Sequence, residues 1–266
     1  MVALRDLVIA DPAVSIADLT EEPPAVVTVD NDQEEVGKTL SRYNLPSLGV
    51  VDALGRLVGR ITFDDVIDVV EAEATEDIFR FAAVSDEEEV RGTTGDAIRS
   101  RLPWLILSVV TAVVASSVVF IYQSTIEAMA LLAVAMPVIA GVGGNAGTQA
   151  LAVTIRRIAL SEETVGERLG VIWKELVVGL VNGLVIGVLA AVLGLLFTDA
   201  GIMFGVVVLL AMWGSLVIAS LAGAFIPIFL ERIGVDPAVA SSPFVTTLTD
   251  LWGFFLLLGL ATAVLM

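Results

Sequence analysis

The sequence of 266 residues contains neither cysteine nor histidine. The lack of cysteine excludes disulfides and thiolate metal sites. Any bound metal must therefore be held by oxygen atoms, which suits hard cations such as Mg²⁺ or Ca²⁺. No catalytic residues stand out, and no enzyme activity is expected.

A signal peptide is not expected either, because Met1–Ala10 carries Arg5 and Asp6 and has too short an apolar core. Hydrophobic residues nevertheless make up 57% of the chain, well above the proportion in an ordinary globular domain. Five runs are long enough to cross a bilayer, which takes about 20 mostly apolar residues. These runs are Leu102–Tyr122, Ala128–Ile155, Leu176–Thr198, Ile202–Leu230 and Pro243–Met266. The first is expected to act as its own insertion signal.

Two of the predicted loops, around Gln123–Glu127 and Asp199–Gly201, contain no lysine or arginine. Basic residues lie before the first span, between the second and third, and between the fourth and fifth. They are Arg99, Arg101, Arg156, Arg157, Arg168, Lys174 and Arg232. The positive-inside rule therefore predicts a cytoplasmic N-terminal region and an external Met266.

Acidic charge is concentrated before the spans. Residues 1–101 hold 22 of the 31 acidic and 9 of the 14 basic residues, which is −13 of the net charge of −17. Such a surface repels nucleic acid and attracts cations, so no nucleic-acid partner is expected. Seven acids share one predicted helix: Asp64, Asp65, Asp68, Glu71, Glu73, Glu76 and Asp77. A second acidic cluster follows at Asp86 to Glu89. Because like charges at helical spacing repel one another, we expect divalent cations to neutralise both clusters.

A small α/β module is predicted for residues 11–77. Strands are expected at 26–29, 47–51 and 57–62, helices at 32–43 and 63–74, and a turn at 52–55. The segment from Leu54 to Asp65 resembles the closing half of a CBS module. In such modules, residues at the positions of Thr62 and Asp65 often contact the ribose and phosphates of an adenine nucleotide. The same pair would also serve as a helix N-terminus.

Two segments flank this module. Met1–Ala10 resembles the end of a preceding CBS module. Residues 78–101 are polar, contain Gly92 and Gly95, and are expected to connect the module to the membrane. Either a helix through part of this segment or a flexible linker fits the sequence.

The second predicted span combines a proline, glycines and amides within an apolar run. The proline removes a backbone hydrogen bond, and the glycines permit either close helix approach or unwound backbone. The motif residues are Pro137, Gly143, Gly144, Asn145, Gly147 and Gln149. A dinucleotide-binding loop is excluded because the flanks are transmembrane rather than β-α-β. In the third span, Gly179, Gly183 and Gly187 recur every four residues and predict helix packing.

Asp250 is the single charged residue in the last predicted span, Pro243–Met266. A carboxylate near the middle of a bilayer costs at least ~3 kcal/mol unless water, a cation or a partner compensates it. It therefore indicates a cation path, and the alternative is an acid hydrogen-bonded to a neighbouring helix for packing. In a continuous helix, Thr246 and Ser242 would extend the polar stripe by one and two turns.

Several of these features together resemble the MgtE family of magnesium channels. They are the CBS module, the acidic segment Glu71–Ile78, the five spans, the motif from Pro137 to Gln149, and Gly234-Val235-Asp236-Pro237 leading to Thr249-Asp250. The resemblance implies a plasma-membrane homodimer with its pore on the two-fold axis, where Asp250 of each subunit faces a largely hydrated Mg²⁺. Ser242 stands where the family is expected to have asparagine.

The resemblance also implies a cytoplasmic magnesium sensor that holds the pore shut when internal magnesium is high. The residues at its positions are Asp68, Glu73, Glu76 and Asp77, with Asp65 as a further candidate.

The predicted fold is therefore an α-helical membrane protein with five transmembrane helices, preceded by a small α/β cytoplasmic CBS module and a connecting helix. The pore domain is expected to comprise residues 102–266. The expected function is that of a Mg²⁺-selective, magnesium-gated channel. Two alternatives remain open: a cation-coupled secondary transporter that uses Asp250 as a proton or sodium site, and a membrane-anchored ion or nucleotide sensor that transports nothing.

Overall fold

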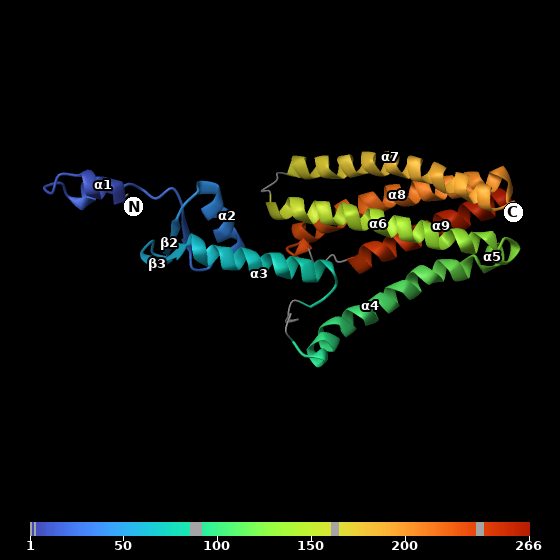
Figure 1. The fold of residues 1–266 in the computed structure, drawn as a ribbon, viewed down its shortest axis with the longest axis horizontal. Coiled ribbons are helices and arrows are strands. Elements are labelled where there is room, and N and C mark those ends of the chain that lie inside the picture. Colours follow the sequence, from blue (N-terminus) through green and yellow to red (C-terminus); the bar gives the residue numbers. More distant parts are fainter. Residues whose placement is uncertain (1, 3, 86–91, 161–164, 238–241) are drawn as a thin grey trace. The chain divides into compact units, whose positions relative to one another are not determined.

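The computed structural model describes residues 2, 4–85, 92–160, 165–237 and 242–266. The chain divides into two compact units, Met1–Glu76 and Asp77–Met266, and the boundary falls within helix α3 (Phe63–Phe81). A small α/β region is followed by long helices (Figure 1). This arrangement confirms the predicted fold class.

The first unit contains a three-stranded sheet of order β1-β2-β3. Its elements are α1 (Leu4–Ile9), the 3-10 helix η1 (Ile16–Leu19), β1 (Val26–Thr28), α2 (Gln33–Tyr43), β2 (Ser47–Val51) and β3 (Leu57–Thr62). Strands β1 and β2 are parallel, so they need the crossover that α2 supplies. Strands β2 and β3 are antiparallel and need only a tight turn, in which Gly55 adopts a φ of +74°. The predicted strands and the first predicted helix are confirmed.

The core of this unit is small. Its buried side chains are Val27, Val36, Leu40, Leu48 and Val66, which come from β1, α2, β2 and α3. At Gly37 of α2, a Cβ atom would lie 3.3 Å from Cγ1 of Val66. The two helices therefore pack closely, and this contact anchors the first turns of α3.

Helix α3 continues to Phe81, beyond Ala74, where the hydrophobic pattern predicted its end, and it carries all seven acids that were predicted to share one helix. The next helix, α4 (Thr94–Ile121), begins with a capping box in which Thr93 and Asp96 each accept a hydrogen bond from the other's backbone N–H. The segment predicted to be a connector thus contains the end of one helix and the start of another. The acidic cluster Asp86 to Glu89 lies outside the described residues, which end at 85 and resume at 92.

The second unit is helical. After α4 come α5 (Gln123–Ala128), α6 (Leu131–Leu160), α7 (Val165–Phe197), α8 (Gly201–Arg232) and α9 (Ser242–Leu265). Among the described residues, five helices are long and apolar enough to cross a membrane: α4, α6, α7, α8 and α9. The five predicted spans are therefore confirmed.

Helix α8 lies at the centre of this unit and packs against α6, α7 and α9. Its Ala211 and Met212 are completely buried in a core that also contains Leu132, Ile139 and Leu257. Helix α4 packs mainly against α9, at the edge of the bundle (Figure 1). Helix α9 thus packs against α4 as well as against α6 and α8.

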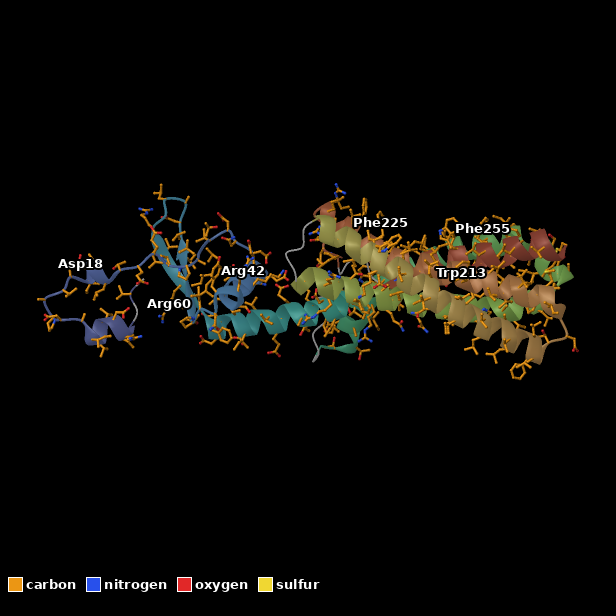
Figure 2. All side chains as sticks on the ribbon, turned by 90° about the horizontal axis from the view of Figure 1, so that it is seen from above. Asp18, Arg42, Arg60, Trp213, Phe225 and Phe255 are labelled. Carbon is orange, nitrogen blue, oxygen red and sulfur yellow. The ribbon has the colours of Figure 1, made fainter. Side chains whose placement is uncertain are left out.

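Glycines set the distances between these helices. A Cβ atom at Gly223 of α8 would lie 2.4 Å from the carbonyl oxygen of Gly147 in α6. On α7, Gly183 leaves room for Trp213, whose indole N–H donates to the Leu180 carbonyl oxygen at 3.0 Å (Figure 2). Similar close contacts to α8 at Gly179 and Gly187 confirm that the α7 stripe serves helix packing.

Helix α6 runs without interruption from Leu131 to Leu160, through Pro137 and the whole glycine motif. Of the two possibilities that the sequence left open, close approach or unwound backbone, the structure has close approach.

Candidate cation pathway

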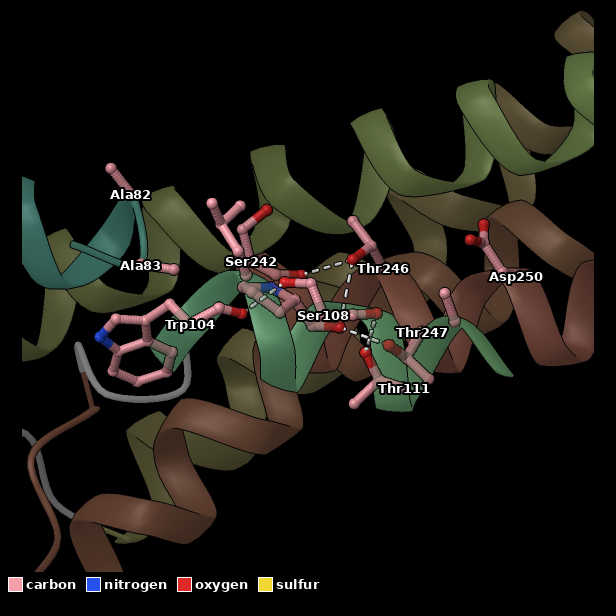
Figure 3. Close-up of a pocket in the computed structure, with 12 residues that line it drawn as sticks. Ala82, Ala83, Trp104, Ser108, Thr111, Ser242, Thr246, Thr247 and Asp250 are labelled. Carbon is pink, nitrogen blue, oxygen red and sulfur yellow. Dashed lines mark hydrogen bonds between the residues drawn. The ribbon is translucent and has the colours of Figure 1, made fainter. Parts of the chain in front are cut away.

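A cavity of about 290 Å³ lies between α4 and α9, at the end where α9 begins (Figure 3). Helix α9 contributes Ser242, Pro243, Thr246, Thr247 and Asp250, and α4 contributes Trp104, Leu105, Ser108, Thr111 and Ala112. Ala82 and Ala83, which follow α3, lie at the end away from Asp250 (Figure 3). The cavity thus combines a short row of hydroxyl groups with one carboxylate.

Asp250 is the ionisable residue of this lining, and its side chain is partly buried. Among the described residues, no salt bridge reaches its carboxylate. Because α9 is a continuous helix, Ser242, Thr246 and Asp250 follow one another at intervals of one turn and line the same cavity. The structure thus brings together the three residues that the sequence placed on a polar stripe.

The sequence did not single out Trp104, Ser108, Thr111 and Thr247. Ser108 and Thr111 are three residues apart, which is the spacing of neighbours on one helix face. Two hydroxyls at this spacing in an apolar span are the signal that could have drawn attention to them. Their position opposite Asp250 depends on the packing of α4 on α9 and has no local signature.

The motif on α6 has two faces. Gly143, Gly144 and Gly147 are buried, whereas Asn145 and Gln149 are exposed, as is Pro137. A Cβ atom at Gly147 would lie 2.7 Å from Cγ1 of Val245, and one at Gly144 would lie 3.5 Å from Cγ2 of Thr246. The glycines therefore let α6 support the first turns of α9, just behind the cavity.

The other face of α6 carries residues at intervals of four. Pro137, Gly141, Asn145 and Gln149 form one exposed stripe along the helix. Two amide side chains within a membrane span need water or a protein partner, because lipid cannot hydrogen-bond to them.

The candidate sensor acids lie along α3. Asp68 is exposed, whereas Glu73, Glu76 and Asp77 are partly buried. The Gln33 side-chain amide donates to the Glu73 carboxylate at 2.7 Å. Among the described residues, no three acidic side chains converge as a ready-made metal site. The four acids thus share a helix without meeting at one point.

Thr62 and Asp65 bond to each other at the start of α3. The backbone N–H and hydroxyl of Thr62 donate to the same Asp65 carboxylate oxygen, at 2.9 and 2.5 Å. These bonds, with the hydroxyl bond contributing most, lower the pKa of Asp65 below its ordinary value. In this structure the pair serves as a helix N-terminus, which is one of the two roles that the sequence allowed.

Two ion pairs connect helix ends in this unit. Arg80 of α3 pairs with Asp236, in the Gly-Val-Asp-Pro segment after α8. Arg168 of α7 pairs with Glu231 of α8 at 2.6 Å. Each pair joins residues far apart in the sequence, which is why no local pattern predicted them.

Comparison with known families assigns the helical unit. Residues 136–260, which include the α6 motif and Asp250, match the family model MgtE, described as a divalent cation transporter. The helical unit is thus similar to this transporter family over residues 136–260. Residues 16–72 match the CBS domain model. The resemblance that the sequence suggested is therefore confirmed.

Relatives with curated names match along almost the whole chain. The sequence is 38% identical to a protein named magnesium transporter MgtE from Thermus thermophilus, over 100% of this chain and 59% of that protein. The identity is also 38% to the protein of the same name from Enterococcus faecalis, over 98% of this chain and 57% of that protein. The Bacillus subtilis protein of that name is 34% identical, over 99% of this chain and 58% of that protein. The chain thus spans somewhat more than half the length of these MgtE relatives.

Proposed function

We propose that this chain conducts Mg²⁺ across the membrane as a magnesium-gated channel. The observation that supports this most directly is the position of Asp250, the one ionisable residue among the described residues that line a cavity inside a membrane-spanning unit. The family description and the names of the three relatives agree with Mg²⁺ as the substrate.

The chemistry of Mg²⁺ suits such a site. This ion gives up water reluctantly and prefers octahedral oxygen coordination. A carboxylate that attracts the hydrated ion, beside hydroxyls that contact its water, avoids most of the cost of dehydration. Asp250, Thr246 and Ser242 are the residues to which we assign this role. Ser242 is shorter than the asparagine expected at its position and reaches less far into the path.

The proposed working unit is a homodimer with the pore on its two-fold axis. The exposed Asn145 and Gln149 on α6 support this proposal, because a second subunit or a water-filled path would satisfy their amides. Repetition of Asp250 by symmetry would place two carboxylates at one level of the pore.

The direction of insertion gives the first prediction. We propose that residues before α4 face the cytoplasm and that Met266 lies outside, as the basic residues indicate. A cysteine placed after Met266 should react with a membrane-impermeant thiol reagent in intact cells, whereas one placed before Thr94 should react only after lysis. The natural chain contains no cysteine, so it provides a clean background. Labelling of both sites from the same side would contradict the proposal.

Regulation gives the second prediction. We propose that Mg²⁺ binds the acids of α3, namely Asp68, Glu73, Glu76 and Asp77, and thereby stabilises a compact closed form. Exchange of Asp68 and Glu76 for alanine is expected to weaken the protection against proteolysis that millimolar Mg²⁺ confers, because fewer repulsive charges remain to be bridged. The measurement is the rate of limited proteolysis with and without Mg²⁺.

The matched control for this experiment is the double variant Asp18→Ala, Asp30→Ala. It removes the same charge from exposed positions outside α3 and should keep the protection of the parent. Equal protection in both double variants would reject the sensor. An adenine nucleotide at Thr62 and Asp65 is a further part of the proposal, and it would have to displace the hydrogen bonds between them.

Flux measurements on the purified protein test the proposal as a whole. Passive entry of Mg²⁺ into proteoliposomes, driven by a membrane potential alone, is the result expected of a channel. A secondary transporter would instead require a proton or sodium gradient. A sensor would leave the liposomes empty of Mg²⁺ under either condition.

A further inference from the structure

The hydroxyl groups around the cavity share one property. Four of them donate their single proton to a backbone carbonyl of their own helix. Ser108 donates to Trp104 at 2.9 Å, Thr111 to Ser108 at 3.1 Å, Thr246 to Ser242 at 2.8 Å, and Thr247 to Pro243 at 2.6 Å. A hydroxyl has one proton and two lone pairs, so while these bonds hold, each of these groups is left to accept hydrogen bonds from an occupant of the cavity.

The remaining lining reinforces this polarity. The carboxylate of Asp250 is also an acceptor, and no lysine or arginine occurs among the described residues that line the wall. Trp104 has an indole N–H donor, but its ring lies at the end of the cavity away from Asp250 (Figure 3). The part of the cavity near Asp250 therefore suits an occupant that is positive and donates hydrogen bonds.

A hydrated divalent cation has both properties, because its inner waters point their protons outward. Six waters at about 30 Å³ each occupy roughly 180 Å³, and the cavity of about 290 Å³ has room for them. An anion would find no donor near Asp250 and would be repelled by the carboxylate.

We propose that Ser108 and Thr111 of α4 form a second wall of the ion path, opposite α9. Their hydroxyl oxygens accept hydrogen bonds from the water shell of the ion that Asp250 attracts, and they thereby favour hydrated Mg²⁺. The proposal rests on the proposed channel function and adds to it two specificity-determining residues on a helix outside the α9 stripe.

The double variant Ser108→Ala, Thr111→Val tests this assignment. Valine has nearly the shape of threonine, so the change removes acceptors while the packing stays close to that of the parent. Loss of two hydrogen bonds to the shell should raise the Mg²⁺ concentration for half-maximal flux into proteoliposomes about tenfold. The rigid hexaamminecobalt(III) ion, whose ammonia ligands donate hydrogen bonds and accept none, should block the parent. Block of the variant should require an about tenfold higher concentration of this ion.

Two controls separate this effect from a change in folding. Ser117 lies on the same helix, is exposed, and donates to the Val114 carbonyl oxygen at 2.6 Å, but it does not line the cavity. Ser117→Ala should therefore keep the flux and block of the parent. Thr111→Ser retains the hydroxyl and should lose clearly less of the Mg²⁺ flux and block than Thr111→Val.

The outcomes distinguish the two proposals. If the parent conducts Mg²⁺ and the double variant matches it in half-saturation and in block, the role of α4 is overturned and the channel stands. If Thr111→Ser is as impaired as Thr111→Val, the effect reflects packing and the role of α4 is likewise overturned. A parent that conducts no Mg²⁺ overturns the channel and this assignment together.

Discussion

Exchange of Asp250 for asparagine should reduce Mg²⁺ flux by more than a hundredfold while the protein remains folded. Asparagine keeps the size and one hydrogen-bonding oxygen but lacks the charge. At an effective dielectric constant of about 20, a carboxylate about 5 Å from a divalent cation contributes several kcal/mol before desolvation is subtracted. Each 1.4 kcal/mol is a factor of ten, so loss of this attraction should empty the path.

The measurement is Mg²⁺ entry into proteoliposomes, with Na⁺ and K⁺ entry recorded in parallel. Asp250→Glu serves as the matched variant because it preserves the charge and moves it by one methylene group. It should retain part of the flux, whereas Asp250→Asn should retain less than a hundredth. If the asparagine variant conducts Mg²⁺ at the rate of the parent with unchanged selectivity over Na⁺ and K⁺, Asp250 is a packing residue and the proposed pore is wrong.

A change of Gly223 to alanine should destabilise the helical unit strongly. The added Cβ atom would lie 2.4 Å from the Gly147 carbonyl oxygen and 2.8 Å from the Leu151 backbone nitrogen. These are backbone atoms of a continuous helix, so they cannot turn aside as a side chain would. Overpacking usually costs about 1–3 kcal/mol, and we expect the upper end or more, equivalent to a thermal midpoint lowered by roughly 10 °C.

Gly141→Ala is the matched control for this prediction. It makes the same chemical change within the motif on α6, but among the described residues no atom beyond its chain neighbours and its own helix backbone lies within 4 Å of the added Cβ. Because alanine favours helix over glycine by up to ~1 kcal/mol, the midpoint should equal or slightly exceed that of the parent. Thermal unfolding in detergent measures both variants. Equal midpoints for Gly223→Ala and Gly141→Ala would mean that α6 and α8 do not cross at Gly147.

Local patterns predicted the elements of the chain well, because each pattern reports a local preference. The five spans follow from long apolar runs, which have a low free energy only in lipid or in a protein core. In the first unit, alternating and helical hydrophobic patterns predicted the three strands and α2.

The end of α3 was predicted too early, at Ala74. The acids up to Asp77 were nevertheless expected on the same helix, and the structure continues it to Phe81. Two tertiary interactions support the extension: Phe81 packs against a cluster that contains Leu151 and Val245, and Arg80 pairs with Asp236.

Some residues of the candidate site could be placed from the sequence, and others only from the packing of the helices. Asp250, Thr246 and Ser242 could be placed on one stripe because they belong to one helix with a known repeat. Ser108 and Thr111 could not be placed beside them, because the sequence does not say which face of α4 packs on α9. The proposed role of each of these residues remains a prediction.

The sequence by itself determined the number of spans, the charge available to a cation and the oxygen nature of any ligand, since these depend only on composition and order. Tertiary structure decided the use of the glycine motif on α6. Glycine permits both unwound backbone and close helix contact, because it lacks the Cβ atom that would forbid either. The outcome depended on the neighbouring helices: the backbone of α8 and the first turns of α9 lie close to Gly147, and α6 is a continuous helix there.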